Sequence, residues 1–170
     1  EILRCLVGSE MCIRDRDEIK ELAQLAGEIW HEYWPCILTE AQINYMVEKF
    51  QSEKAIIEQI LHQNYSYYFI VENGVKCGYF GISRCKDYLF LSKLYLKKEF
   101  RHRGIGRAAF DKIKELAKNF GYSSIRLTVN KNNKKTINAY LKYRFAIIDK
   151  AVTDIGNGFV MDDYIMSYTI

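Results

Sequence analysis

Hydrophobic positions in the first third of the chain recur every three to four residues, as they do on one face of an α-helix. Between residues 17 and 34 this spacing predicts an amphipathic helix that ends before Pro35. Thr39 and Gln42 form the T-x-x-Q pattern of a capping box, which predicts a second helix up to about residue 50. Ser52 is a preferred N-cap residue and predicts a third, short helix through residue 60.

The pattern changes to that of β-strands at residue 65. Residues 65–72 are rich in aromatic and β-branched side chains, and Asn73 and Gly74 form a strong hairpin-turn pair. Residues 75–84 therefore predict the returning strand. Residues 88–97, with the sequence YLFLSKLYLK, predict a further strand.

The remaining elements alternate between helix and strand. The spacing predicts a helix over residues 104–120, with Gly121 at its C-terminal cap. A strand follows at residues 124–130 and a helix at residues 134–143. The last two predicted strands, on either side of a turn at residues 155–158, are residues 145–154 and 159–169.

The order of these elements predicts the fold class. A strand–helix–strand unit needs a parallel, right-handed crossover, whereas strands joined by tight turns are antiparallel. We therefore expect a single-domain α/β protein with a mixed, mostly antiparallel central sheet and helices on both faces.

Composition is that of an ordinary globular protein. The length of 170 residues suits one domain, and 49% hydrophobic residues suffice for one core. No apolar run reaches the roughly 18 residues of a membrane span. The five cysteines form no C-x-x-C pair and no metal-ligand spacing, so we expect no metal and a cytoplasmic protein. A net charge of +4 does not by itself indicate a nucleic-acid partner.

Residues 1–16 differ in character from the rest of the chain. We interpret this stretch, EILRCLVGSEMCIRDR, as a foreign leader and assign the functional domain to residues 17–170. The alternative is a native first strand over residues 1–7, followed by a turn at Gly8 and Ser9. A foreign leader would leave Cys5 and Cys12 without functional meaning.

The segment most informative about function lies between the strand at residues 88–97 and the helix at residues 104–120. It reads RHRGIGR over residues 101–107. A glycine-rich turn that opens a helix presents unpaired backbone N–H groups, and the helix dipole adds positive potential. The turn therefore predicts a phosphate site, although it matches neither the P-loop nor the dinucleotide pattern. The alternative is a basic helix start on a solvated face.

This segment resembles a signature of the GNAT superfamily of N-acetyltransferases, Q/R-x-x-G-x-G/A between a strand and a helix. Arg101, Gly104 and Gly106 carry the resemblance. It extends over roughly residues 17–170. The resemblance implies the acyl-CoA N-acyltransferase fold and acetyl-coenzyme A (acetyl-CoA) as co-substrate.

A second signature of the superfamily, N-x-x-A-x-x-x-Y-x-x-x-G-F, is met in part on the helix after the next strand. Asn133, Tyr140 and Phe145 align with it. Thr136 replaces the small Ala, and Arg144 replaces the Gly. The Arg144 departure bears on the geometry of the local turn rather than on the family.

The resemblance implies how acetyl-CoA is held. Backbone N–H groups of residues 103–107, with His102, would bind the pyrophosphate. The end of the strand at residues 88–97 would pair with the pantetheine arm and polarise the thioester carbonyl. The implied cofactor-binding residues are Leu94, Tyr95, Leu96, Arg101, His102, Arg103, Gly104, Ile105, Gly106, Arg107 and Asn133.

Tyr140 is implied as the catalytic general acid that protonates the departing CoA thiolate. The ordinary pKa of tyrosine, about 10, exceeds that of a thiol, about 8.5, so full transfer needs local tuning. The alternative is that Tyr140 only packs on the sheet edge. No general base is assigned, because Ser92 and Lys93 occupy the strand where a carboxylate would be useful.

The resemblance implies direct attack by a primary amine, from a small molecule or a peptide, in a ternary complex. Four aromatic residues are candidates for the acceptor pocket, with a place in the core as the alternative: Trp30, Tyr33, Trp34 and Tyr45. Three carboxylates either attract a cationic amine or are solvated turn and edge charges: Asp154, Asp162 and Asp163.

Two other functions stay open at this point. A non-catalytic acyl-CoA sensor is one, although the presence of Asn133 and Tyr140 argues against it. A basic nucleic-acid binder is the other, and it would show steep salt dependence without needing acetyl-CoA. We expect neither a nucleic-acid nor a membrane partner, because the three phosphates of CoA account for the clustered basic residues. A homodimer is left open.

Overall fold

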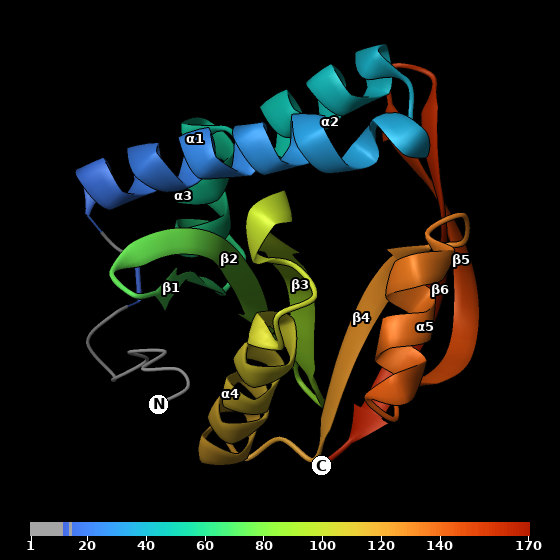
Figure 1. Cartoon of the computed structure of the whole chain (residues 1–170). Coiled ribbons are helices and arrows are strands. Elements are labelled where there is room, and N and C mark those ends of the chain that lie inside the picture. The colour runs from blue at the N-terminus through green and yellow to red at the C-terminus, as the bar shows by residue number, and fades with distance from the viewer. Residues whose placement is uncertain (1–11, 14) are drawn as a thin grey trace.

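The computed structural model describes residues 12, 13 and 15–170, and its helices begin where the sequence predicts them (Figure 1). The side chains of Asp15, Thr39 and Ser52 each accept a hydrogen bond from a backbone N–H three residues further on. No helix in this part of the chain is long and apolar enough to cross a membrane. The elements before the sheet are α1 (Arg16–Tyr33), the 3-10 helix η1 (Trp34–Cys36), α2 (Glu40–Gln51) and α3 (Glu53–His62).

Strands and helices alternate through the rest of the chain, and the strands form one sheet in the order β1-β2-β3-β4-β6-β5. Among the described residues β3 and β4 are the only parallel neighbours, and the other pairs are antiparallel. The predicted mixed, mostly antiparallel sheet is therefore confirmed. The elements are β1 (Tyr65–Glu72), β2 (Val75–Arg84), β3 (Leu89–Leu96), η2 (Lys98–Phe100), α4 (Ile105–Asn119), β4 (Ser124–Asn130), α5 (Lys134–Lys142), β5 (Ala146–Gly156) and β6 (Phe159–Thr169).

Helices cover both faces of the sheet, and successive residues of a strand serve opposite faces. Tyr67 of β1 and Tyr79 of β2 are fully buried in a cluster with apolar residues of α1 and α3. Their sequence neighbours Tyr68 and Phe80 belong to the cluster on the other face, with α4, where their rings stack at 4.8 Å. The sheet thus separates two core layers.

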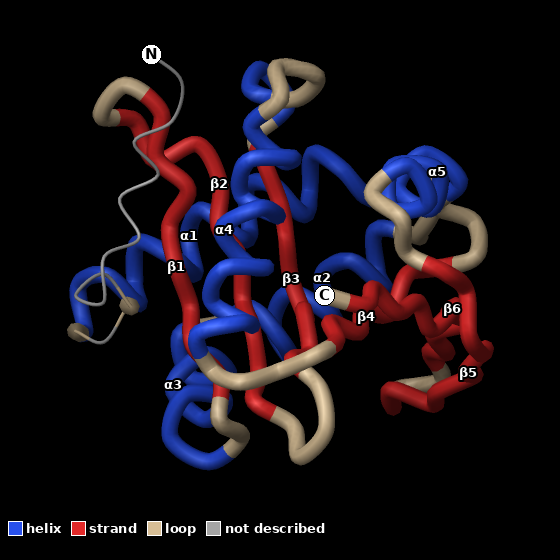
Figure 2. The backbone as a smooth tube through the Cα atoms, turned by 90° about the horizontal axis from the view of Figure 1, so that it is seen from below, coloured by secondary structure: helices blue, strands red, loops and turns tan. Residues whose placement is uncertain are grey.

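The sheet opens between its two central strands, β3 and β4. In the described chain these strands pair only at Leu89 with Ile125 and at Phe90 with Arg126. Beyond that point the register between β2 and β3 shifts, which leaves Ser92 as an extra residue, a β-bulge. Figure 2 shows the result: β1, β2 and β3 run together, and β4, β6 and β5 form a second group that turns away from them.

Arg144 lies just past the C-terminal end of α5, in the left-handed region with φ 69°. Its N–H donates to the carbonyl of Leu141, and the N–H of Phe145 donates to the carbonyl of Tyr140. These two bonds form a Schellman motif, in which glycine is the usual left-handed residue. The departure from the family signature therefore keeps the turn, but puts a residue with a Cβ atom at a left-handed position where glycine fits best.

The predicted turn of the last hairpin is too long, and the predicted boundary of the foreign leader is not tested. The last hairpin turns at Asn157 and Gly158 rather than over residues 155–158, because β5 continues to Gly156. The foreign leader falls mostly on residues 1–11 and 14, outside the described residues, and stays a prediction. Of its described part, Ile13 is buried and donates its N–H to the carbonyl of Tyr67.

Candidate functional site

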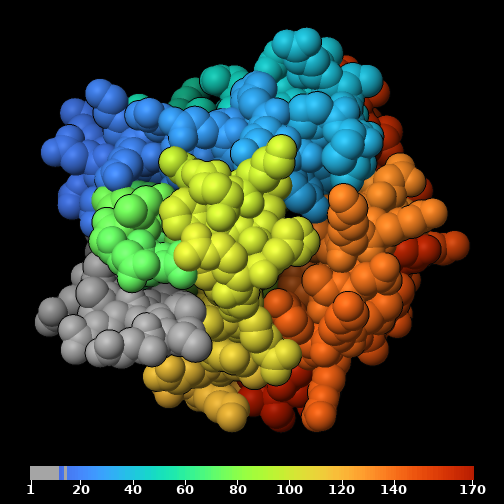
Figure 3. Space-filling view, in the orientation of Figure 1, coloured from blue at the N-terminus to red at the C-terminus, as the bar shows by residue number. Residues whose placement is uncertain are grey.

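The glycine-rich loop opens α4 as an anion-binding helix start. Gly104 is the N-cap, with φ 80°, and it provides no side-chain cap. The first intrahelical bond runs from the N–H of Ala108 to the carbonyl of Gly104. The N–H groups of Ile105, Gly106 and Arg107 therefore have no acceptor within the helix. Together with the dipole of this 15-residue helix, they suit a phosphate group. Figure 3 shows the loop (yellow) at the surface between α1 (blue) and α5 (orange).

Arg101 connects this loop to α1. Its Nε donates to the carbonyl of Leu96 at 2.9 Å, and its Nη2 donates to the carboxylate of Glu32 on α1 at 2.8 Å. The guanidinium also lies 4.9 Å from the centre of the Tyr33 ring. The side chain of Arg101 thus fixes the path of the loop, and part of its charge is already neutralised.

The other two arginines of the loop are also paired. Arg103 meets Glu72 at 3.2 Å, and Arg107 meets Asp111 at 3.6 Å. Arg107 additionally lies 5.1 Å from the centre of the Tyr143 ring. Because both side chains are half exposed, these pairs are weak and can exchange for a phosphate.

The end of β3 presents a free backbone edge toward β4. The N–H of Lys97 donates to the carbonyl of Cys77 on β2, and in an antiparallel pair the bonding direction alternates along the strand. The N–H groups of Leu94 and Leu96 therefore face away from β2, into the opening. Tyr95, between them, buries its ring against Trp30. This edge has the geometry that strand-like pairing with an extended ligand requires.

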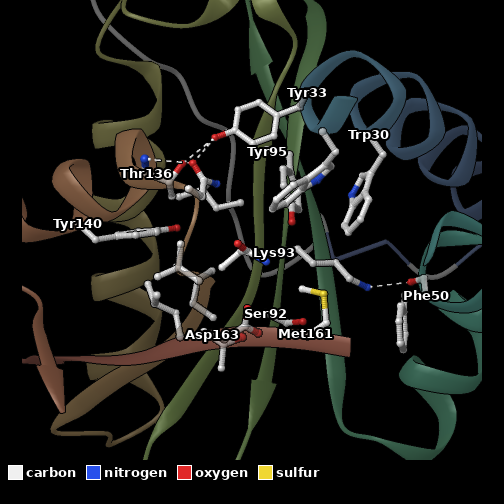
Figure 4. A pocket seen from close by; sticks show the side chains of 18 of the residues that line it. Trp30, Tyr33, Phe50, Ser92, Lys93, Tyr95, Thr136, Tyr140, Met161 and Asp163 are labelled. Carbon is white, nitrogen blue, oxygen red and sulfur yellow. Dashed lines mark hydrogen bonds between the residues drawn. The ribbon is translucent and has the colours of Figure 1, made fainter. Parts of the chain in front are cut away.

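A cavity of about 630 Å³ fills the opening between β3 and β4 (Figure 4). It reaches the glycine-rich loop at His102 and Gly106, and it extends to the first helices at Trp30 and Trp34. The cavity therefore joins the predicted phosphate site to the predicted acceptor side. Among the predicted cofactor residues, those that line it are Leu94, Tyr95, Leu96, Arg101, His102, Gly106 and Asn133.

Asn133 is buried at the N-cap of α5. Its Oδ1 accepts hydrogen bonds from the N–H of Thr136 at 3.3 Å and from the hydroxyl of Tyr33 at 2.9 Å. Tyr33 also bonds the Thr136 hydroxyl at 2.8 Å, so it links α1 to α5 across the cavity, as Figure 4 shows. The amide nitrogen of Asn133 remains as the group that can donate to a ligand.

Tyr140 extends from α5 into the cavity (Figure 4). Its ring packs on Phe145, with centroids 5.1 Å apart, and edge-on against Tyr143 at 6.4 Å. Burial, followed by the nearby hydroxyls of Tyr143 and Tyr33, raises the pKa of Tyr140 well above its usual value. The phenol is therefore protonated at any physiological pH, as a proton donor must be. The raised pKa also makes it a weaker acid, so this environment does not supply the tuning toward the thiol pKa that full transfer needs.

Three of the four aromatic candidates line the cavity, and all four contribute to the core. Trp30 and Trp34 are buried, with ring centroids 5.3 Å apart, and Tyr33 meets Trp34 edge-on. All three line the cavity. Tyr45 instead packs on Phe159 and is absent from the cavity wall.

Of the three candidate carboxylates, one lines the cavity. Asp154 accepts the N–H of Gly156 in the last hairpin, and Asp162 pairs with Lys131. Asp163 lies in the cavity wall, and its Oδ1 is covered without a hydrogen-bond partner among the described residues. Burial, reinforced by the charge of Asp162, raises the pKa of Asp163 to about 6. This carboxylate is suited to a cationic ligand.

Lys93 is a cavity residue to which sequence reasoning assigned no role. Its side chain is buried, and burial lowers the pKa of its amine to about 7. A lysine inside an otherwise apolar strand was the available signal. Its direction depends on the bulge at Ser92, which the sequence pattern does not reveal.

Comparison with known proteins identifies the family. The model of the acetyltransferase (GNAT) family matches residues 24–145, well over half of the chain. The chain is 27% identical to a spermidine N(1)-acetyltransferase of Thermoplasma acidophilum over 150 residues, which cover 86% of this chain and 91% of the relative.

Solved structures share the fold. PaiA N-acetyltransferase from Thermoplasma acidophilum, in complex with coenzyme A, has a TM-score of 0.72 at 20% identity, over 91% of this chain and 94% of that one. A GNAT family acetyltransferase from Elizabethkingia anophelis, with acetyl-CoA bound, has a TM-score of 0.58 at 19% identity, over 69% and 83%. The family inferred from the two signatures is thus confirmed, and the chain belongs to the acetyltransferase (GNAT) family, as an acetyl-CoA-dependent N-acetyltransferase.

Proposed function

We propose that this enzyme transfers the acetyl group of acetyl-CoA directly to the primary amine of a small molecule, with both substrates bound at once. The observation that carries the proposal is the continuous cavity in the opening between β3 and β4. One end of it meets the N-terminus of α4, and the other is lined by aromatic residues and Asp163. Two substrates can therefore meet from opposite sides of the sheet.

The residues at the α4 end fit acetyl-CoA. The unpaired N–H groups of residues 105–107 bind the pyrophosphate, and Gly104 keeps a side chain out of the way at a backbone angle that favours glycine. Arg103 and Arg107 exchange their carboxylate partners for phosphate oxygens. The free edge of β3 pairs with the pantetheine arm, which the amide nitrogen of Asn133 also reaches.

The chemistry at the thioester needs a neutral amine, one donor for the developing oxyanion and one for the leaving sulfur. The acceptor ammonium gives one proton to solvent before its nitrogen attacks the carbonyl carbon, and the nitrogen gives up a second proton after the C–N bond has formed. A backbone N–H at the free edge of β3, at Leu94 or Leu96, supplies the donor for the oxyanion. Losing a comparable donor costs about 2.7–4 kcal/mol in a well-studied hydrolase. Tyr140 supplies the donor for the sulfur, as the general acid that protonates the CoA thiolate when the C–S bond breaks.

The acceptor amine binds on the side of α1 and α2. Trp30 and Trp34 provide an apolar wall for its carbon skeleton, and Asp163 faces its positive charge. The Thermoplasma relative is named for its action on spermidine, which supports a small amine as acceptor.

We also place the enzyme in the cytoplasm. Among the described cysteines, Cys12, Cys36 and Cys85 are free thiols. Free thiols are typical of proteins that work in a reducing compartment.

The experiment that tests the function follows the release of CoA thiol from acetyl-CoA. A panel of aliphatic and aromatic monoamines, polyamines, amino acids, aminoglycosides and short peptides serves as acceptors. Release that depends on a small amine supports the proposal. A folded protein that binds acetyl-CoA but releases no thiol with any acceptor would instead be an acyl-CoA sensor.

A further inference from the structure

The ammonium of Lys93 sits in a cage of oxygen acceptors and aromatic ring faces. Its Nζ lies 4.7 Å from the centre of the Tyr67 ring and 5.5 Å from that of Tyr65. All three of its hydrogens have partners, and only 6% of the residue is exposed. The acceptors are the carbonyl of Phe50 at 3.1 Å, Oε1 of Gln59 at 3.0 Å and the hydroxyl of Tyr67.

No carboxylate among the described residues lies within ion-pairing distance of this amine. The groups that face it are neutral on every side: the end of α2 gives a carbonyl, α3 an amide, and β1 two phenols. Burial raises the pKa of both Tyr65 and Tyr67, so neither phenol ionises near neutral pH. The charge of Lys93 is therefore solvated by dipoles and ring faces, as a bound ligand cation would be.

This cage belongs to the acceptor side of the cavity. Lys93, Tyr65, Gln59 and Phe50 all line it. Figure 4 shows the Lys93 amine directed toward Phe50 at the end of α2, while Tyr140 enters from the opposite side. An amine that reacts near Tyr140 and extends along the aromatic wall would bring its far end toward Lys93.

We infer that Lys93 determines acceptor specificity, because its own ammonium fills the place that the second ammonium of a polyamine would need. The acceptor is then an amine with one positive charge and an apolar body. This inference rests on the proposed function and narrows its substrate class. The acceptor would then differ from spermidine, for which the Thermoplasma relative is named.

The test compares kcat/KM for 2-phenylethylamine with that for the diamine cadaverine and for spermidine. At pH 6, one unit below the pKa of Lys93, about ten Lys93 side chains are charged for each neutral one. At that pH we expect the wild-type enzyme to favour the monoamine about ten-fold, since two unit charges a few ångströms apart repel strongly in a partly buried site. Lys93→Ala empties the cage and should shift this ratio about ten-fold toward the diamine at the same pH. Lys93→Met removes the charge but keeps the bulk, so its shift should be smaller. Lys76→Ala is the control, because Lys76 pairs with Glu21 on the outer surface.

A second readout needs no variant. Between about pH 6 and 8, Lys93 loses its proton while both amines of cadaverine stay charged. The wild-type ratio of diamine to monoamine kcat/KM should therefore rise with pH. In the proposed binding mode Asp163 faces the amine that reacts in either acceptor, so its titration should cancel in the ratio.

Three results would overturn the inference: a wild-type preference for spermidine, an unchanged ratio in folded Lys93→Ala, or a pH-independent ratio in the wild type. Wild type that binds acetyl-CoA but turns over only acceptors other than these amines would also overturn the inference and leave the proposed function standing. Wild type that binds acetyl-CoA and releases no thiol with any acceptor of the full panel would overturn the proposed function itself, and the inference with it.

Discussion

Replacing Tyr140 with Phe removes one oxygen atom and should leave the rest of the site in place. The ring would keep its contacts with Phe145 and Tyr143. No hydrogen bond to the Tyr140 hydroxyl is found among residues 12, 13 and 15–170, so the change leaves no partner unsatisfied. The free energy of unfolding should therefore change by less than about 0.5 kcal/mol.

The expected effect on catalysis is much larger. The raised pKa of Tyr140 keeps its proton on the ring oxygen throughout the assay range, so every molecule carries the acid form. A positioned general acid contributes about 10²–10⁴-fold, which corresponds to about 2.7–5.4 kcal/mol in the barrier. We expect kcat to fall by that factor, while the Kd of acetyl-CoA changes less than about two-fold, because the loop at α4 and the edge of β3 are untouched.

The assay is thiol release under saturating acetyl-CoA, with affinity measured separately by calorimetry. Tyr122→Phe is the matched control, because the Tyr122 hydroxyl donates to the carbonyl of Cys85, outside the cavity wall. It should cost about 1 kcal/mol of stability and leave kcat unchanged. An unchanged kcat in Tyr140→Phe would refute the assignment of Tyr140 as the acid, and water would then have to protonate the thiolate.

Three further changes test other parts of the structure. Arg144→Gly should raise the free energy of unfolding by about 1 kcal/mol in urea titrations, because the left-handed backbone at this position suits glycine; a loss of stability would contradict the Schellman geometry. Gly78→Ala should lower stability by about 2–3 kcal/mol, since the added Cβ would overlap the carbonyl oxygen of Tyr95; a neutral result in the same titration would mean that β2 and β3 lie further apart. Asp163→Asn should raise the KM of the amine about ten-fold without changing acetyl-CoA affinity. In the wild type the KM should rise as pH falls through about 6, because Asp163 is then protonated, and the Asn variant should lack this rise. Equal KM values for both enzymes would remove Asp163 from the acceptor site.

Much of the fold could be predicted because its local signals are strong. Thr39 and Ser52 cap their helices as the sequence suggests, and Asn73 with Gly74 turns the first hairpin. The turn of the glycine-rich loop could be predicted as well, since Gly104 adopts a backbone angle that other residues avoid. Each of these features depends on a few consecutive residues, which is the range that a sequence pattern describes.

The roles of the acceptor residues depended on contacts between distant segments. Asp154, Asp162 and Asp163 look alike in sequence, and only the pairing of β6 with β4 turns Asp163 into the cavity beside Asn130. Tyr45 is, like the tryptophans, an aromatic residue in an amphipathic helical segment, but it hydrogen-bonds the carbonyl of Ile155 instead of lining the cavity. Composition gives no means to separate these cases.

The β-bulge at Ser92 explains why the sequence pattern did not predict that Lys93 lines the cavity. Strict alternation would put Lys93 on the same face as Leu89 and Leu91, inside the core against α4. The extra residue reverses the alternation, so Lys93 turns toward Gln59 on the other face and Leu94 takes the place next to α4. The same bulge lies where β3 ceases to pair with β4. One extra residue, Ser92, therefore accompanies both the opening of the sheet for acetyl-CoA and the presence of a cation on the acceptor side. A deletion of Ser92 that restores strict alternation should therefore weaken the binding of acetyl-CoA and of the amine together.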